Sequence, residues 1–217
     1  MKSKGNIKDN CFLIVICILM ISFTVNIYQA IENNKYSYEL GKQNYNKIEE
    51  IRYRNESILS ILESCVSAGS VNNSDLLTLH RNYKITELEL SLWSNYLNDN
   101  KHMFISKKNR SKNIVVSTTS KNELYSEIEE LIYSYIQNDM TEKKDVIELQ
   151  GKVAENFENL KSMSIDLNNY FNDFYAKNCD LSDEMKEKKM INHDYWIDIL
   201  QGMQEVNSKY WDYEFIY

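Results

Sequence analysis

The sequence contains no proline and only five glycines among its 217 residues. These two residue types supply most tight turns, so a chain with so few of them is poorly suited to the many turns of an all-β fold. Histidine is also scarce, and His80, His102 and His193 show no metal-ligand spacing to each other, to cysteine or to carboxylates. The shortages favour long helices, and we expect no metal site.

The short motifs of nucleotide binding and nucleophilic catalysis are missing as well. The chain has no glycine-rich phosphate loop, no G-x-S-x-G and no C-x-x-C. Its formal net charge is −7, whereas nucleic-acid binding requires a basic face that neutralises phosphates. We therefore expect no enzymatic activity, no cofactor and no nucleic-acid partner.

The longest uncharged run is CFLIVICILMISFTVNIYQAI, from Cys11 to Ile31. At about 1.5 Å per helical residue, twenty-one residues span roughly 30 Å, the thickness of a bilayer's hydrocarbon core. A cleaved secretory signal has a shorter apolar centre and small residues before the cut, and here Tyr28 and Ala30 fit that pattern poorly. An uncleaved membrane anchor is the preferred interpretation; a cleaved signal and a buried core helix are the alternatives.

The charges beside this run predict its orientation. Lys2, Lys4 and Lys8 precede it, so the positive-inside rule keeps residues 1–10 in the cytoplasm, with 11–31 as the transmembrane segment. Residues 32–217 then form an extracytoplasmic domain with a charge of about −9, large enough for its own core. The richness in Lys, Asn, Ile and Tyr with little Ala is typical of an AT-rich bacterial genome.

Apolar residues at helical spacing predict an all-α fold after the anchor, an elongated antiparallel bundle or coiled coil of four to five helices. The expected helices are 36–68, 75–98, one that starts after the capping box Ser120–Glu123, and 182–213. A turn at 67–74 separates the first two, with Gly69 as the stop and Ser74 or Asp75 as the next N-cap. The predicted buried stripes are Ile48, Ile51, Ile58, Leu62 and Cys65; Leu76, Tyr83, Leu90, Trp93 and Leu97; Leu124, Ile128, Leu131 and Tyr135; Trp196, Leu200, Met203, Val206, Tyr210 and Tyr213.

The most regular pattern runs from Val146 to Phe174, where apolar residues alternate at spacings of three and four. Asn156 is its polar member, and an Asn in such a seam usually fixes register or partner. Phe157 beside it is the alternative packing residue. The heptad phase permits one helix over 121–178, but Asp139 and Thr141 favour a break between two helices.

Residues 99–119 interrupt the helical pattern and carry a local basic patch on an acidic protein: Lys101, Lys107, Lys108, Arg110 and Lys112. One interpretation is a flexible solvated loop. The other is contact with anionic membrane headgroups or a cell-wall polymer.

Cys65 and Cys179 lie in the presumed outer domain, each at the end of an expected helix. An extracytoplasmic pair is able to form a disulfide if the two Cα atoms come within about 7 Å. They meet at one end of the bundle if 121–178 is a single helix, and fall at opposite ends if the chain reverses. Unpaired buried thiols are the alternative.

The chain resembles the N-terminal helical region of spore-germination membrane proteins of the YpeB type. The shared features are an anchor followed by ENN (32–34), NY (44–45), and S-x-L-L-x-x-H-R from Ser74 to Arg81. They cover under half of the chain, and no site residue is carried over. The plan is also similar to the chemoreceptor sensor module, a four-helix bundle outside the membrane, without its second span.

The expected function is that of a non-enzymatic, single-pass protein that holds or organises a protein partner at the bacterial envelope, or associates with itself through its helices. The alternatives are an extracytoplasmic sensor of a small ligand and a spore-germination accessory protein. A partner-holding protein is expected to have a contiguous exposed apolar or charged face without a pocket. A sensor predicts a cavity between helices lined by polar groups.

Overall fold

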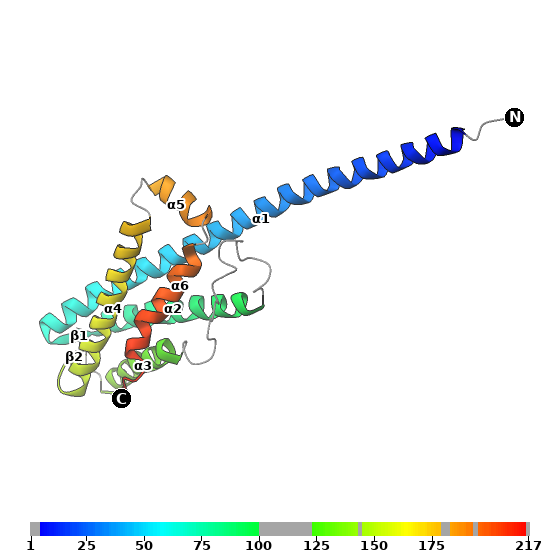
Figure 1. Cartoon of the computed structure of the whole chain (residues 1–217). Helices are drawn as coiled ribbons and strands as arrows, with labels where there is room; N and C mark the ends of the chain where they lie inside the picture. Colours follow the sequence, from blue (N-terminus) through cyan, green and yellow to red (C-terminus); the bar gives the residue numbers. More distant parts are fainter. Residues whose placement is uncertain (1–4, 100–122, 143–144, 179–182, 193–194, 216–217) are drawn as a thin grey trace. The chain divides into compact units, whose positions relative to one another are not determined.

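The computed structural model describes residues 5–99, 123–142, 145–178, 183–192 and 195–215. Six α-helices lie in these ranges: α1 (Gly5–Ala68), α2 (Asn73–Asp99), α3 (Glu123–Glu142), α4 (Lys152–Asn178), α5 (Asp183–Asn192) and α6 (Tyr195–Asn207). The short elements are β1 (Ser70–Asn72), β2 (Val146–Glu148) and the 3-10 turn η1 (Ser208–Tyr210). The predicted all-α class is confirmed (Figure 1).

The chain divides into two units, residues 1–40 and 41–217. In the first unit, every residue from 11 to 39 is exposed, including the aliphatic side chains of the uncharged run. A helix that is apolar on all sides is stable only in apolar surroundings. By length and composition α1 is able to cross a membrane, as the sequence predicts.

In the second unit, two helical hairpins are joined by a short antiparallel ribbon. Strand β1 follows α1 and β2 precedes α4, and the two strands pair (Figure 1) with Val71 opposite Ile147. Gly69 ends α1 with φ +67°, as expected of a glycine stop. The ribbon itself was not expected, and the cap of α2 differs from the prediction. The Asn72 side chain, rather than Ser74 or Asp75, accepts the backbone N–H of Asp75 at 2.9 Å.

The chain reverses between α3 and α4, so the predicted break is confirmed and the single helix over 121–178 is wrong. The regular helical pattern expected from Val146 also begins later than predicted, at the start of α4. Val146 pairs in β2 instead, and Gly151, at φ +54°, directly precedes α4. The expected single helix over 182–213 is wrong too. Its residues divide into α5, α6 and η1.

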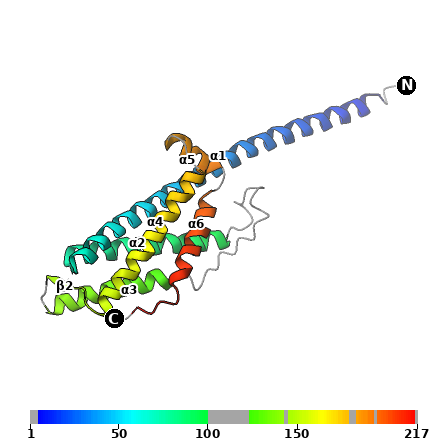
Figure 2. The same ribbon diagram turned by 60° about the vertical axis from the view of Figure 1, so that its left-hand side comes forward.

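The predicted stripes form the core. Their members are buried in each helix: Ile48, Ile51, Ile58, Leu62 and Cys65 in α1; Leu76, Tyr83 and Trp93 in α2; Leu124, Ile128, Leu131 and Tyr135 in α3; Trp196, Leu200 and Met203 in α6. Leu90, Val206, Tyr210 and Tyr213 are half-buried, and the side chain of Leu97 is outside the described part. Helices α4 and α6 pack closely (Figures 1 and 2), since a Cβ on Gly202 would lie 2.1 Å from the Tyr170 ring.

Asn156 and Phe157 of α4 are both fully buried. The Asn156 amide donates to the Tyr135 hydroxyl at 2.7 Å and accepts from the Tyr213 hydroxyl at 2.9 Å. This asparagine therefore joins α3, α4 and the C-terminal segment within one chain. Phe157 packs beside it, with its ring 6.2 Å from that of Tyr135.

Candidate functional site

The residues predicted to act fall mostly outside the described ranges. Lys101, Lys107, Lys108, Arg110, Lys112 and Cys179 all do, and so does Ser120 of the capping box. Cys65 is a buried free thiol on α1. Burial, with a smaller contribution from the charge of Asp75, raises the pKa of Cys65 to about 11. The proposed disulfide stays a prediction, but the reversal between α3 and α4 is the arrangement for which Cys65 and Cys179 are expected at opposite ends of the bundle.

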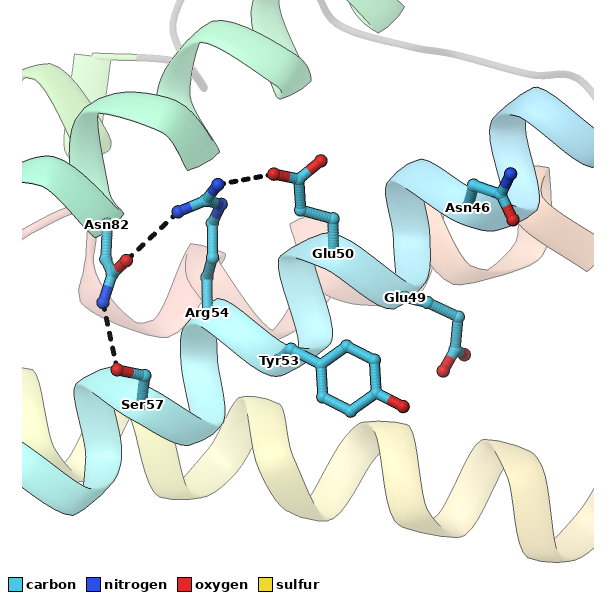
Figure 3. Close-up of a pocket in the computed structure, with 7 residues that line it drawn as sticks. All are labelled: Asn46, Glu49, Glu50, Tyr53, Arg54, Ser57 and Asn82. Carbon is cyan, nitrogen blue, oxygen red and sulfur yellow. Dashed lines mark hydrogen bonds and ion pairs between the residues drawn. The ribbon is translucent and has the colours of Figure 1, made fainter.

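A groove of about 460 Å³ lies between α1 and α2 (Figure 3). Helix α1 contributes most of its lining and α2 contributes one side chain. The lining residues are Asn46, Glu49, Glu50, Tyr53, Arg54, Ser57 and Asn82. All of them are polar or aromatic residues, although apolar atoms of their side chains make up most of the lining surface.

Arg54 is the centre of the hydrogen bonds in this groove. Its guanidinium donates to Glu50 one turn earlier and to the Asn82 side chain of α2 at 3.2 Å (Figure 3). Asn82, only 7% exposed, in turn donates to the Ser57 hydroxyl at 3.2 Å. The Arg54 Nε atom is buried without a hydrogen-bond partner among the described residues. The groove therefore carries one strongly held cation beside a carboxylate, Glu50, that is 46% exposed.

Glu49, at one end of the groove, connects α1 to two other helices. It accepts hydrogen bonds from Arg52 at 2.8 Å and from the Tyr175 hydroxyl of α4 at 2.6 Å. Lys186 of α5 lies 3.6 Å from the same carboxylate and 3.8 Å from the centre of the Tyr175 ring. Burial, and then the bond to Glu49, raises the pKa of Tyr175. Glu49 therefore has partners on α4 and α5 as well as on its own helix.

The outward face of α2 carries an exposed apolar stripe. Leu77, Leu88 and Leu92 are 56%, 53% and 49% exposed. Leu77, Arg81, Leu88 and Leu92 follow each other at spacings of four, seven and four, which places them on one helix face. We call these four residues the α2 stripe. The α2 stripe was not predicted from the sequence, because the helical spacing that identifies the buried side of α2 does not include Leu77, Leu88 or Leu92.

The edges of the α2 stripe are tied to the neighbouring helices. Toward α3, His80 and Lys84 lie 2.8 and 3.1 Å from the Glu129 carboxylate. Toward α1, Lys47 lies 2.8 Å from Glu89. Arg81 forms no ion pair with any residue that the structure describes. The stripe is thus a fixed surface with one exposed, unpaired cation among three leucines.

The described residues contain no group of three or more metal-ligating side chains. Comparison with protein-family models, curated proteins and solved structures finds no match to this chain. The resemblance to germination proteins therefore rests on its short motifs alone. What the chain does has to be argued from the groove, the α2 stripe and the apolar helix.

Proposed function

We propose that this chain is a single-pass protein of the bacterial cell membrane whose helical bundle lies outside the cytoplasm and holds a protein partner. The uncharged run of α1 and the lysines before it support the anchor and its orientation. The titratable groups of the groove support a non-enzymatic role. Arg54 is paired with Glu50, and Glu49 is held by Arg52, Tyr175 and Lys186, so none of them is poised for proton transfer.

One observation carries the proposal: the α2 stripe leaves three leucines about half exposed on one helix face. Single exposed leucines are common, but three on one face with Arg81 among them form a mixed apolar and basic surface of the kind that protein interfaces bury. The same helix buries Leu76, Leu79 and Trp93 on its opposite side. Helix α2 is therefore already held in place by its inner face, and the outer face is available to a partner.

The test is site-specific photo-crosslinking of the full-length chain in the membranes of its source organism. A photo-reactive amino acid at Leu88 should yield a discrete protein adduct. The matched control carries the same group at Glu158, which is exposed on α4. An adduct of equal yield from both positions, or none from any exposed position of the bundle, would refute a partner-holding role.

The groove between α1 and α2 favours a second candidate, a sensor of a small polar ligand. Arg54 and the exposed Glu50 present opposite charges side by side, which suits a molecule carrying both a carboxylate and an ammonium group. Free amino acids should then raise the melting temperature of the full-length chain, and Arg54→Gln should remove that increase. If no amino acid changes the melting temperature, the sensor is excluded for this class of ligand.

A further inference from the structure

We infer that the partner of the α2 stripe is an amphipathic helix whose apolar side is flanked by acidic residues. This inference rests on the proposed function, because it names the chemistry of the partner held at that surface. It starts from the spacing of the stripe, in which the leucines recur every four or eleven residues. A second helix laid along such a ridge buries its own apolar face against it at the same periodicity.

The charges on the α2 stripe indicate which charge the partner helix carries beside its apolar side. Arg81 lies among the leucines and has no ion pair in the described structure, and Lys84 beside it is 62% exposed. The described acids around this surface are paired or lie away from Arg81. The acids that pair with arginine, lysine or histidine are Glu50, Glu89 and Glu129. Glu87, half-buried on α2, lies on the side of Lys84 that faces away from Arg81. An acidic side chain on the partner would therefore meet an unpaired guanidinium, whereas a basic one would be repelled.

The same charges disfavour two of the ways in which two copies of the α2 stripe pair with each other. Antiparallel pairing that sets Leu77 against Leu88 of the second copy also sets Arg81 against its Lys84. Parallel pairing sets Arg81 against the same residue. Both arrangements place like charges together at an interface where solvent screening is reduced.

An anionic membrane surface is also disfavoured as the occupant. A membrane surface is wider than the stripe, so it would also approach the exposed Glu50 on one side and Glu129 on the other. Both carboxylates would repel anionic headgroups. The domain as a whole is acidic, at about −9. A single helix avoids that repulsion because it covers only the stripe itself.

The experiment uses two synthetic amphipathic peptides of about 20 residues, with leucines at helical spacing and flanks of either Glu or Lys. Their binding to the full-length chain in non-ionic detergent is followed by fluorescence anisotropy at low and high salt. Because the chain is net negative, general electrostatic attraction favours the basic peptide. We expect the acidic peptide to bind about tenfold or more tightly than the basic one, with a smaller difference at high salt. Such a result would show that binding depends on the local charge of the stripe and not on the net charge of the chain.

Variants connect this preference to the stripe. Arg81→Glu should reverse it and Arg81→Lys should retain it. Lys177→Glu, the same charge change at an exposed site on α4, should leave it unchanged. Leu88→Gln should weaken binding of both peptides. Circular dichroism confirms that each variant is folded.

Equal affinities, a preference for the basic peptide, or a preference that survives Arg81→Glu would overturn the inference. If the Leu88 crosslink forms in membranes while the acidic preference is absent, the partner-holding function stands and only its chemistry is wrong. If the crosslink is absent and neither peptide binds, both proposals fall. Adducts to lipid or to a second copy would overturn the acidic-helix partner directly.

Discussion

The two halves of the α1–α2 pair have different interiors. Next to the β1–β2 ribbon the contact is apolar, with Ile58, Leu62, Leu76 and Leu79 all at most 2% exposed. Toward the other end, Ile48 and Ile51 are still buried, but both helices also contribute buried polar groups. These groups are Asn44, Arg54, Asn82, Thr86 and Glu89.

The polar half is also incompletely hydrogen-bonded. The Asn44 side chain accepts from the Trp93 indole at 3.0 Å, but its Nδ2 atom has no acceptor among the described residues. The buried Thr86 hydroxyl has no partner there either. A buried polar group without a hydrogen bond costs about 1–3 kcal/mol, so this half of the pair is stabilised less than the apolar half. The pairing of α1 with α2 is therefore more stable next to the ribbon than at the other end.

The largest expected effect comes from the apolar half. Leu62→Ala removes a side chain that is fully buried, and such changes destabilise by about 2–5 kcal/mol. Denaturant unfolding of the full-length chain, followed by circular dichroism, measures it. Leu77→Ala on the exposed face is the control and should change stability by less than about 0.5 kcal/mol. Equal losses in the two variants would mean that the ribbon end is not the packed core.

The second effect is a loss of stability at alkaline pH. Tyr83 is buried near Ser164 without a hydrogen bond of good geometry, and burial raises its pKa in the folded state. The folded chain thus favours the neutral phenol. Its contribution is complete below pH of about 10, the unfolded value, and is lost as pH rises, at up to about 1.4 kcal/mol per pH unit.

Unfolding midpoints at pH of about 9 and about 11 test this. Tyr83→Phe should reduce the pH slope, while the equivalent change at the exposed Tyr53 should not. Part of the slope should remain, because burial raises the pKa of Tyr125 as well. A slope that Tyr83→Phe leaves unaltered would show that this phenol titrates normally.

The fold was predictable to the extent that it depends on periodicity. Each buried stripe follows from spacing of three and four, and Gly69 was recognised as a stop because only glycine readily adopts its positive φ. The ribbon was not predicted because Val71 and Ile147 lie in strands too short to show an alternating pattern. Their pairing is a contact between segments far apart in the sequence. The division of α5 from α6 was missed because no proline or glycine marks it in the sequence.

The site was much less predictable. Glu49 and Tyr175 are separated by 126 positions, and no local pattern indicates that they meet. The partnership of Arg54 with Asn82 likewise depends on how α1 lies against α2. Two pairs, each within one turn of α1, were available from spacing: Glu50–Arg54 and Glu49–Arg52.

Loss of an unpaired buried hydroxyl from the polar half should have the opposite effect on stability to Leu62→Ala. Thr86→Val keeps the shape of the side chain and removes a buried hydroxyl that lacks a partner. The variant should therefore be as stable as the parent chain or more stable, by about 1 kcal/mol. Denaturant unfolding under the same conditions measures it, with Thr78→Val as control, since the exposed Thr78 hydroxyl donates to the Ser74 carbonyl. A clear loss of stability in Thr86→Val would show that the hydroxyl is satisfied.

The smallest effect is expected at the rim of the groove. Two substitutions there distinguish the contribution of an exposed ion pair from that of a buried, hydrogen-bonded amide. Glu50→Gln removes the carboxylate that pairs with Arg54 across one helical turn, and exposed pairs of this kind contribute about 0.2–0.5 kcal/mol. The change should disappear in high salt, because screening weakens the ion pair. Asn82→Ala, which leaves Arg54 and Ser57 without their buried amide, should cost about 1–3 kcal/mol and resist salt. If Glu50→Gln cost as much as Asn82→Ala, the exposed carboxylate rather than the buried amide would hold the polar half of α1 to α2.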